Sequence, residues 1–443
     1  MTETLNAVSP IMPDNSAVEH SRTALISKGL KRRHAREKRF QLYGMMGIAF
    51  AVACLLMLFA TIIGNALPGF SETRLQLDIH LSTKQIDPIK SGDPMIIGNA
   101  NYGKIIRNSL RRHFPDVKGR RDKRQLVKML SAGAGFILRN KVLDDPSLIG
   151  KTVSIWFPLS ADMDQFYKGG ISSNVAESDR RVSDKQIVWL RRLIEMGRID
   201  SRFNTTLFTA GDSREPELAG FRGAFVGSFY TLLVTLALSF PIGVASAIYL
   251  EEYAPKNRWT QLIEVNINNL AAVPSIVFGL LGLAVFLNFF NLPRSAPLVG
   301  GMVLALMTLP TVIIASRAAL MAVPPSIREA ALGIGASRWQ TVVHHVLPLA
   351  LPGIMTGTII GMARALGETA PLLMIGMVAF IVDIPGAITD PATVMPVQIY
   401  LWADAPERAF VERTAAATLA LVGFLVLMNA LAVILRKKFE IKW

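Results

Sequence analysis

Residues 326–335 read Ser-Ile-Arg-Glu-Ala-Ala-Leu-Gly-Ile-Gly and follow directly on two prolines. The pattern predicts a short helix with Ser326 as its N-cap and Glu329 at the third helical position, where its side chain can return to the cap. Gly335 is expected to end that helix, because glycine adopts the left-handed conformation that closes many helices.

The same helix would present a small-residue face. Ala330 and Ala331 leave room for another protein to pack closely against it, and residues 336–345 would start a second helix that leads into Leu347 and Pro348. A short capped helix between two apolar tracts is therefore predicted to be a docking element rather than an ordinary loop.

Composition places this segment in a membrane protein. The chain has 443 residues, 51% of them hydrophobic, 18% charged, and a mean hydropathy of +0.38, so its charges must be segregated. This composition excludes collagen, coiled coil and wholesale disorder. The single cysteine, Cys54, excludes a disulfide framework and a cysteine-based zinc site. The net charge of +14 is attributed to cytoplasmic loops and lipid headgroup contacts rather than to nucleic acid.

Six apolar tracts can cross a bilayer, for which a helix needs about 20 residues. Five are Leu42–Gly64, Phe225–Leu250, Leu262–Phe290, Pro297–Val323 and Thr414–Leu435. The sixth, Leu347–Val382, is longer than one upright helix needs, and Gly367 and Pro371 are expected to break or bend it. A second leg would be too short to span, so one bent or partly re-entrant crossing is predicted.

Basic residues predict the orientation. Residues 1–40 carry eight lysines and arginines, and four follow Leu435, which are Arg436, Lys437, Lys438 and Lys442. Both termini are therefore expected in the cytoplasm. The tract 42–64 resembles a signal peptide only superficially, because its apolar run exceeds the usual core of 7–15 residues. An uncleaved anchor is the preferred interpretation.

Residues 65–222 form one polar insert with 26 basic and 18 acidic residues. Alternation of apolar and polar residues predicts a strand at Leu75–Leu81, and further strands are predicted at Thr152–Leu159 and Asn204–Ala210. Amphipathic helices are predicted at Asp122–Lys141 and at Ser183–Arg198, the latter opened by a capping box of Ser183 and Gln186. The insert is expected to be an α+β domain outside the membrane. His80 and His113 lack a second ligand at metal spacing, so no metal site is predicted.

The predicted organisation has four parts: a cytoplasmic basic tail (1–41), a transmembrane helix (42–64), the periplasmic insert (65–222) and a helical core (223–443). The core holds five transmembrane helices and the cytoplasmic loop 324–348. The excess of eight positive charges in the insert suits a solvated surface facing anionic lipid, docking to an acidic partner, or local enrichment of an anion.

A second motif lies within an apolar tract, at residues 361–373. It contains Arg364 and Glu368, which at i, i+4 share one helix face and can pair. A charge inside the membrane is costly and normally faces the bundle interior or a water-filled path. A structural ion pair without a transport role remains the alternative.

The loop resembles the EAA loop of ABC-importer permeases. Glu329, Ala330, Ala331, Gly335, Leu347 and Pro348 match that pattern. His345 departs from it, since the family usually has isoleucine there. The resemblance implies that this loop forms a coupling helix seated in a cleft of an ATP-hydrolysing subunit, whose closure tilts the spans.

The second motif resembles the phosphate-specific transport permeases of the A type, the PstA family. Further matching segments are Tyr249–Ala254, Val273–Val277, Gly279–Gly282 and Pro396–Trp402. The resemblance covers about residues 220–443. It implies an α-helical polytopic membrane protein with the type I ABC importer permease fold, about six transmembrane helices and, in this chain, an additional α+β domain.

The implied function is that of a permease subunit of an ATP-driven inorganic phosphate importer in the bacterial inner membrane. The resemblance implies a translocation path with Arg364, Glu368, Thr369 and Arg317. Arg317 departs from the family, in which a basic residue often stands where this chain has Ile314. The implied partners are a second permease subunit, a pair of ATP-binding subunits, a periplasmic phosphate-binding protein and membrane lipid, with no nucleic acid.

No enzyme activity or cofactor is expected of this chain itself. Gly150-Lys151-Thr152 looks like the end of a P-loop, but Asp145 stands where the first glycine is required. The alternatives are a permease for sulfate, molybdate or phosphonate, and a membrane-anchored sensor or scaffold. A secondary carrier is disfavoured, because the hydropathy shows no inverted repeat and few carboxylates lie within the apolar tracts.

Overall fold

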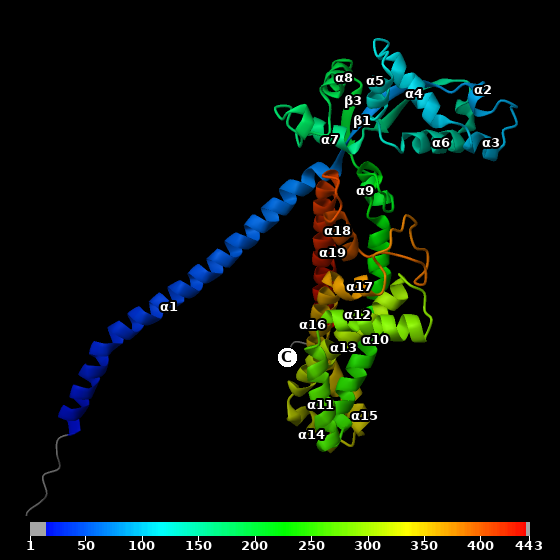
Figure 1. Cartoon of the computed structure of the whole chain (residues 1–443). Helices are drawn as coiled ribbons and strands as arrows, with labels where there is room; N and C mark the ends of the chain where they lie inside the picture. The colour runs from blue at the N-terminus through cyan, green and yellow to red at the C-terminus, as the bar shows by residue number, and fades with distance from the viewer. Residues whose placement is uncertain (1–14, 440–443) are drawn as a thin grey trace, which may run out of the picture. The chain divides into compact units, whose positions relative to one another are not determined.

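The computed structural model describes residues 15–439, so the predictions that fall on residues 1–14 and on Lys442 lie outside it. The chain forms two compact units, residues 1–61 and 62–443. Residues 15–61 of helix α1 (Asn15–Ala66) make up the described part of the first unit (Figure 1). The helix begins well before the predicted span 42–64, so residues 15–41 of the predicted tail are helical. Its large apolar side chains, such as Phe50 and Met57, are exposed, which suits a lipid surrounding.

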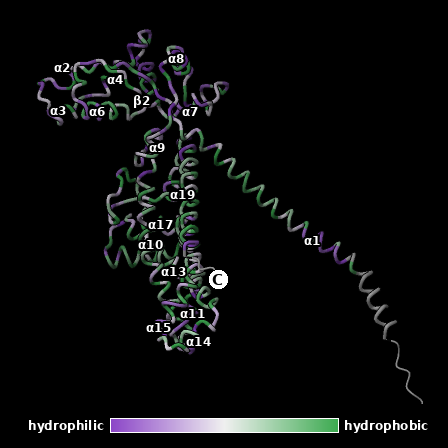
Figure 2. Tube along the Cα trace, turned by 180° about the vertical axis from the view of Figure 1, so that it is seen from behind, coloured by the Kyte–Doolittle hydropathy of each residue, from purple (hydrophilic) through white to green (hydrophobic). Residues whose placement is uncertain are grey.

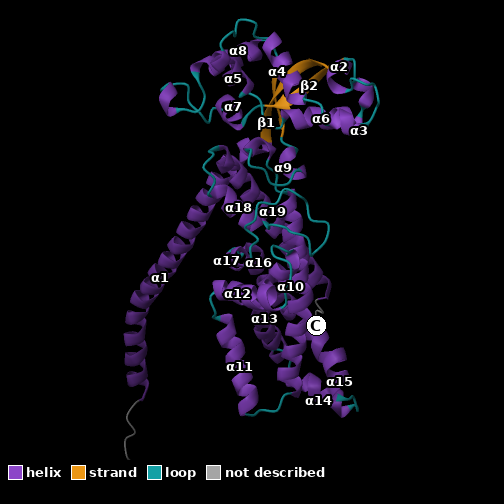
Figure 3. Ribbon diagram, turned by 45° about the vertical axis from the view of Figure 1, so that its right-hand side comes forward, coloured by secondary structure: helices purple, strands orange, loops and turns teal. Residues whose placement is uncertain are grey.

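The second unit begins with a three-stranded antiparallel sheet (Figure 3). Its strands are β1 (Ser71–His80), β2 (Thr152–Pro158) and β3 (Ile199–Phe203), in the order β2-β1-β3. Alternate residues of β1, Leu75, Leu77 and Ile79, are fully buried, and Leu77 lies opposite Ile155 of β2. The strand predictions at 75–81 and 152–159 are confirmed.

The predicted strand at Asn204–Ala210 is wrong. The sheet strand β3 ends at Phe203, and α9 (Thr206–Thr209) follows. The cause is Asn204, whose side-chain oxygen accepts the Leu207 N–H at 3.1 Å and whose amide donates to the Gly69 carbonyl. Asparagine competes for backbone groups in this way and favours a turn over a strand.

Helices cover the sheet. They are α2 (Thr83–Ile86), α3 (Pro94–Gly98), α4 (Tyr102–Arg112), α5 (Arg120–Val127), α6 (Ala134–Asp144), α7 (Ala161–Tyr167) and α8 (Asp184–Glu195), with short 3₁₀ turns η1 (Leu67–Phe70), η2 (Pro146–Leu148), η3 (Glu177–Asp179) and η4 (Pro216–Leu218). The capping box of Ser183 and Gln186 at the start of α8 is confirmed. The insert therefore has the predicted mixed α+β architecture.

The single helix predicted at Asp122–Lys141 is wrong, because α5 ends at Val127 and α6 starts at Ala134. Between them the chain turns toward β2, where Leu130 forms a bridge with Leu159 and the Ser131 N–H donates to the Pro158 carbonyl. Pairing with the sheet edge, a tertiary interaction, interrupts a segment whose local pattern is helical.

The remainder of the second unit is helical, and Figure 2 shows hydrophobic residues along α10 and α19. Its elements are α10 (Arg222–Ile248), η5 (Tyr249–Tyr253), α11 (Arg258–Ala271), α12 (Ser275–Leu281), η6 (Gly282–Phe289), α13 (Pro297–Met321), α14 (Pro325–Gly333), α15 (Arg338–Gln340), η7 (Thr341–Val346), α16 (Leu347–Gly367), α17 (Ala370–Met374), α18 (Met395–Ala403) and α19 (Ala409–Phe439).

Five helices in the described chain are long and apolar enough to span a membrane, or six if one bent pair counts as a span. The five are Arg33–Phe70, Arg222–Tyr253, Pro297–Met321, Arg338–Gly367 and Ala409–Lys438. The prediction of about six spans is confirmed at this level. The tract 347–382 breaks as expected, with α16 ending at Gly367 and Pro371 at the start of α17.

The tract Leu262–Phe290, which was predicted to cross the bilayer, is not a straight helix. Helix α11 and the α12–η6 helix meet at an angle of 103°, with the break at residues 272–274. Pro274 is the N-cap of α12, and a proline there has no N–H to continue the preceding helix. This bent pair packs on α13, which also contacts α10 and α16. At Gly357 of α16, the side chain of Ala315 of α13 leaves no room for a Cβ, so the two helices approach closely.

Charged and polar contacts join the insert to the helical core. The Lys168 ammonium donates to the carbonyls of Pro68 and Ser71 at 2.9 and 2.7 Å, and its Nζ lies 3.9 Å from a carboxylate oxygen of Glu412 at the start of α19. The Trp402 indole N–H donates to Asp212 at 2.9 Å. These contacts make residues 62–443 one folded unit.

Candidate functional site: the α14 loop and the Arg364–Glu368 pair

The loop 324–348 folds around α14. Its N-cap is Pro324 and not the predicted Ser326, which lies within the first turn without a capping hydrogen bond. The prolines explain the difference, because a proline at the first helical position is preorganised for the helix and needs no N–H partner. Glu329 is exposed, so its carboxylate is available to a partner.

Gly335 ends α14 as predicted. Its φ of +89° is left-handed, and the Ala336 N–H donates to the Ala331 carbonyl while the Gly335 N–H donates to the Leu332 carbonyl. This pair of bonds is a Schellman motif, which satisfies carbonyls that the helix leaves free. Ile334, between helix and glycine, is 82% exposed.

The two alanines face different ways. Ala330 is exposed, whereas Ala331 is only 4% exposed and packs inward. The prediction of a shared alanine face is therefore wrong for Ala331. The outward surface of the loop is more apolar than the alanines suggested, since Leu332 and Trp339 are 48% and 64% exposed. We call these two residues and Ile334, the three large exposed apolar side chains of this loop, the loop face.

Arg328 fixes α14 to the rest of the core. Its guanidinium donates to Glu252 in η5 at 2.7 Å and to the carbonyls of Leu320 and Val323, at the end of α13, at 2.9 and 2.8 Å. Arg328 lies in the segment 326–335 and Glu252 in the segment 249–254, and no local pattern in either segment predicts that the two residues pair. The partial negative charge at a helix C-terminus adds to this attraction.

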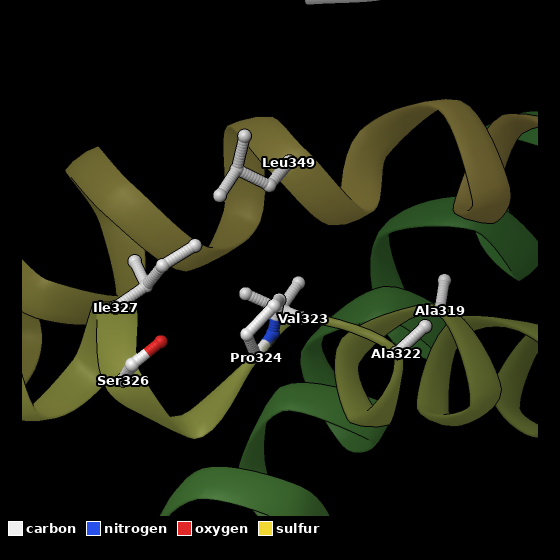
Figure 4. Close-up of a pocket in the computed structure, with 7 residues that line it drawn as sticks. All are labelled: Ala319, Ala322, Val323, Pro324, Ser326, Ile327 and Leu349. Carbon is white, nitrogen blue, oxygen red and sulfur yellow. The ribbon is translucent and has the colours of Figure 1, made fainter. Parts of the chain in front are cut away.

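A pocket of about 380 Å³ lies behind the loop (Figure 4). Its lining comes from the end of α13, the start of α14 and the start of α16, and consists of Ala319, Ala322, Val323, Pro324, Ser326, Ile327 and Leu349. Leu347 and Pro348, predicted coupling residues, begin α16 and are half-buried, while His345 is exposed. The loop therefore sits at the junction of two long helices.

Arg364 and Glu368 pair as predicted, with 3.4 Å between Arg364 Nε and Glu368 Oε1. Helix α16 ends at Gly367, so Glu368 is its C-cap residue rather than part of a continuing helix. The Arg364 side chain is 51% exposed and that of Glu368 is 19% exposed. Thr369 is half-buried and its carbonyl accepts the N–H groups that open α17. Arg364 is thus accessible from outside the fold, whereas Glu368 is mostly buried within it.

Arg317 does not join that pair in any contact between described residues. Its Nη2 lies 2.9 Å from Glu264 of α11 and 3.5 Å from Glu251 of η5. These contacts tie α13 to two neighbouring elements. The acidic partners are 53 and 66 positions away in sequence, so only the fold brings them to Arg317.

In the part of the chain that the structure describes, no three histidine, cysteine or carboxylate side chains are grouped so that they could hold a metal ion. The arrangement offers instead a half-exposed arginine beside a carboxylate, at the end of an apolar helix, and a rigidly held exposed helix. The first can contact an anion and the second can contact another protein.

The helical core matches a known protein family. Residues 239–441 match the family described as binding-protein-dependent transport system inner membrane component. Residues 27–177 match a domain of unknown function, DUF3333. The match over residues 239–441 defines an inner-membrane, multi-pass transport permease and confirms the predicted helical importer-permease fold class.

Individual relatives narrow the assignment. The phosphate transport system permease protein PstA 1 of Mycobacterium tuberculosis H37Rv is 32% identical over 217 residues, 49% of this chain and 70% of that protein. The chain belongs to the PstA family of ABC-transporter permeases. The probable ABC transporter permease proteins YqgI and YqgH of Bacillus subtilis are 37% and 36% identical, and this chain spans about half the length of each.

Among solved structures, the inward-facing MetNI methionine ABC transporter in its CY5 native crystal form is similar at 18% identity. It covers 48% of this chain and 95% of its own, with a TM-score of 0.38.

Proposed function

We propose that this chain is a membrane-spanning permease subunit of an ATP-driven inorganic phosphate importer. It forms the translocation path with a second permease, and a pair of ATP-binding subunits hydrolyses the ATP. An extracytoplasmic phosphate-binding protein delivers the substrate. The observation that carries the proposal is α14, a short exposed helix fixed by Arg328 to the ends of two core elements.

The loop face is the proposed ATPase contact. Exposed Leu332, Ile334 and Trp339 supply apolar area, and Glu329 adds a charge at the edge. A central apolar contact with a polar rim is the usual anatomy of a protein interface. Because α14 is tied to η5 and α13, a push on it moves both elements as rigid bodies.

Arg364 is the proposed anion contact in the path. A guanidinium suits a compact oxyanion, and its half-exposed position lets an ion approach and leave. Glu368 holds the arginine and lowers its attraction for the ion, which favours passage over capture. Thr369 lies at the same break between α16 and α17. Arg317 has two acidic partners, so its proposed role is to hold α13 against its neighbours beside the path.

Phosphate is the proposed substrate because the PstA relatives carry it in their names. Sulfate, molybdate and phosphonate remain the alternatives. Competition by each oxyanion against phosphate uptake distinguishes them: only phosphate should block uptake at low concentration.

In the proposed orientation the N-terminal tail, the loop 324–348 and the C-terminus are cytoplasmic, and the insert 65–222 is periplasmic. The basic residues at both ends support this orientation. The chain is proposed to carry no ATPase site and to need no cofactor, so hydrolysis belongs to its partners.

The test is co-purification from detergent, comparing the wild type with the double variant Glu329→Lys/Gly335→Asp. An ATPase should accompany the wild-type chain and be lost from the variant. The matched control is Glu195→Lys, a charge reversal at an exposed site on α8 of the insert, which should keep the ATPase. An ATPase absent from all three chains contradicts the importer and favours the sensor or scaffold.

A further inference from the structure

The insert carries two adjoining cavities between α4 and α6. The first has a volume of about 570 Å³ and the second about 480 Å³. They share Gly103, Ala132 and Gly135 in their linings. A Cβ on Gly135 would lie 3.6 Å from the backbone of Gly103. We call the two cavities together the α4–α6 groove.

Three cations line the groove without an acidic partner among residues 15–439. Arg107 and Lys128 belong to the first cavity and Arg139 to the second. The Arg139 Nε is buried and has no hydrogen-bond partner in the described structure. A buried guanidinium nitrogen without a partner is costly, so the groove is short of hydrogen-bond acceptors.

One carboxyl oxygen in the groove lacks a donor among the described residues. Glu217 is 6% exposed and lines the first cavity, and its Oε2 has no hydrogen-bond partner in the part of the chain described. Burial raises the pKa of this carboxyl, and Ser131 and backbone hydrogen bonds offset only part of the effect. The groove therefore leaves Arg139 Nε without an acceptor and Glu217 Oε2 without a donor, and it adds the exposed cations Arg107 and Lys128.

Part of the wall of the first cavity is apolar, with Ile106, Leu110 and Leu130, and a second carboxylate, Glu215, also lines this cavity. Phe136, 67% exposed, lines the second cavity. A single inorganic anion would use one or two of the cations and leave the apolar wall and most of the volume empty.

We propose that the α4–α6 groove binds an acidic segment of another protein chain. Its carboxylates pair with Arg107, Lys128 and Arg139, a main-chain N–H donates to Glu217, and an apolar side chain covers the wall. A peptide is the ligand class that supplies all three groups at once, and the net charge of +8 on the insert attracts it. The proposal rests on the proposed function in one respect, which is that the insert lies outside the cytoplasm.

The test begins with a photo-crosslinking amino acid at Phe136 of the full chain in cells. Its matched control is the same amino acid at Val188, which is 63% exposed on α8. Phe136 should crosslink to one acidic segment of a partner, identified by its peptide masses, and Val188 should not. The synthetic segment should then bind the full chain in nanodiscs, and Arg107→Glu/Arg139→Glu should weaken it by about tenfold or more. Replacing its acidic residues by lysine should restore binding to the double variant.

Three results overturn the proposal: crosslinks from Phe136 only to lipid, the same crosslinks from both positions, or an affinity that charge reversal leaves unchanged. Displacement of the segment by millimolar inorganic phosphate, with phosphate alone bound by the wild type, would show an anion site instead. ATPase co-purification through α14 does not involve the groove. If the crosslink fails while the ATPase still co-purifies, only the proposal of peptide binding in the α4–α6 groove is refuted. If the ATPase does not co-purify with the wild-type chain, the proposal of an importer is refuted.

Discussion

Arg328 Nη2 lies 2.7 Å from Oε1 of Glu252, a residue 76 positions earlier in the chain. The same guanidinium also donates hydrogen bonds to the carbonyls of Leu320 and Val323. A side chain with fewer N–H groups could not make all of these contacts. One side chain thus joins α14, the end of α13 and η5. In the proposed importer this joint transmits ATPase movement to the membrane helices.

Arg328→Lys should lower ATP-driven uptake by about tenfold. This is the effect of losing roughly 1.4 kcal/mol from the contacts that hold α14 against α13 and η5. Lysine keeps the charge but cannot reach the carboxylate and both carbonyls. Uptake and ATP hydrolysis by the assembled complex are measured together, and hydrolysis should continue with less transport. The control is Arg202→Lys, at an exposed ion pair with Asp200. Wild-type uptake by Arg328→Lys would show that the contacts of Arg328 are not needed to transmit ATPase movement to the membrane helices.

Gly335→Ala should weaken ATPase binding, because an alanine at φ +89° costs about 1–2 kcal/mol and distorts the end of α14. Gly333→Ala is the matched control, two residues away, with no neighbouring atom within 4 Å of its added Cβ and an ordinary helical φ. The affinity of the purified chain for its ATPase measures the difference. Equal affinities for both variants would mean that the left-handed turn is not needed for docking.

Arg364→Ala should reduce uptake by at least about tenfold while the complex still assembles, since the proposed anion contact is lost and the open side chain supports little packing. Arg364→Lys should keep part of the activity. Ile360→Ala, one turn earlier on α16 and 60% exposed, is the control and should transport normally. Normal uptake by an assembled Arg364→Ala complex would assign the Arg364–Glu368 pair a structural role only.

Glu217→Gln should stabilise the chain at pH 8 if the groove is empty. Burial raises the pKa of Glu217 in the folded state, so its contribution is fully present below the unfolded pKa and is lost as pH rises through the folded pKa. Glutamine cannot ionise and avoids this loss. Thermal unfolding in nanodiscs at pH 4 and pH 8 measures it. A variant no more stable than the wild type at pH 8 would contradict the assignment of a destabilising buried charge.

Lys168→Met should lower the free energy of unfolding by about 3 kcal/mol, because a buried carboxylate and two carbonyls lose their donor. Lys185→Met removes an ion pair with Asp122 whose lysine is 60% exposed, and it should cost less than about 1 kcal/mol. Thermal unfolding of the two variants gives the comparison. Equal losses would show that the contacts of Lys168 contribute no more than a surface ion pair.

Local signals predicted the features that depend on neighbours in sequence. The alternation of Leu75, Leu77 and Ile79 gave the central strand, and the Ser183–Gln186 box gave the start of α8. The spacing of Arg364 and Glu368 predicted their contact, because i, i+4 residues meet whenever the backbone is helical.

Features that depend on distant partners were missed. The break between α5 and α6 arises from the pairing of Leu130 with Leu159, which no local pattern encodes. The partners of Arg317 and Arg328 come from other elements, so neither joint could be read from the loop motif alone. Pro274 did carry a local signal for the bend between α11 and α12, but the hydropathy of the whole tract outweighed it.

Uptake of radiolabelled phosphate is measured in proteoliposomes that contain this chain, its second permease, the ATPase pair and the binding protein. With ATP on the ATPase side, the account predicts phosphate accumulation that requires every component, is not blocked by sulfate, and falls by at least about tenfold with Arg364→Ala. Uptake without ATP, or equal uptake of sulfate and phosphate, would contradict the proposed phosphate importer.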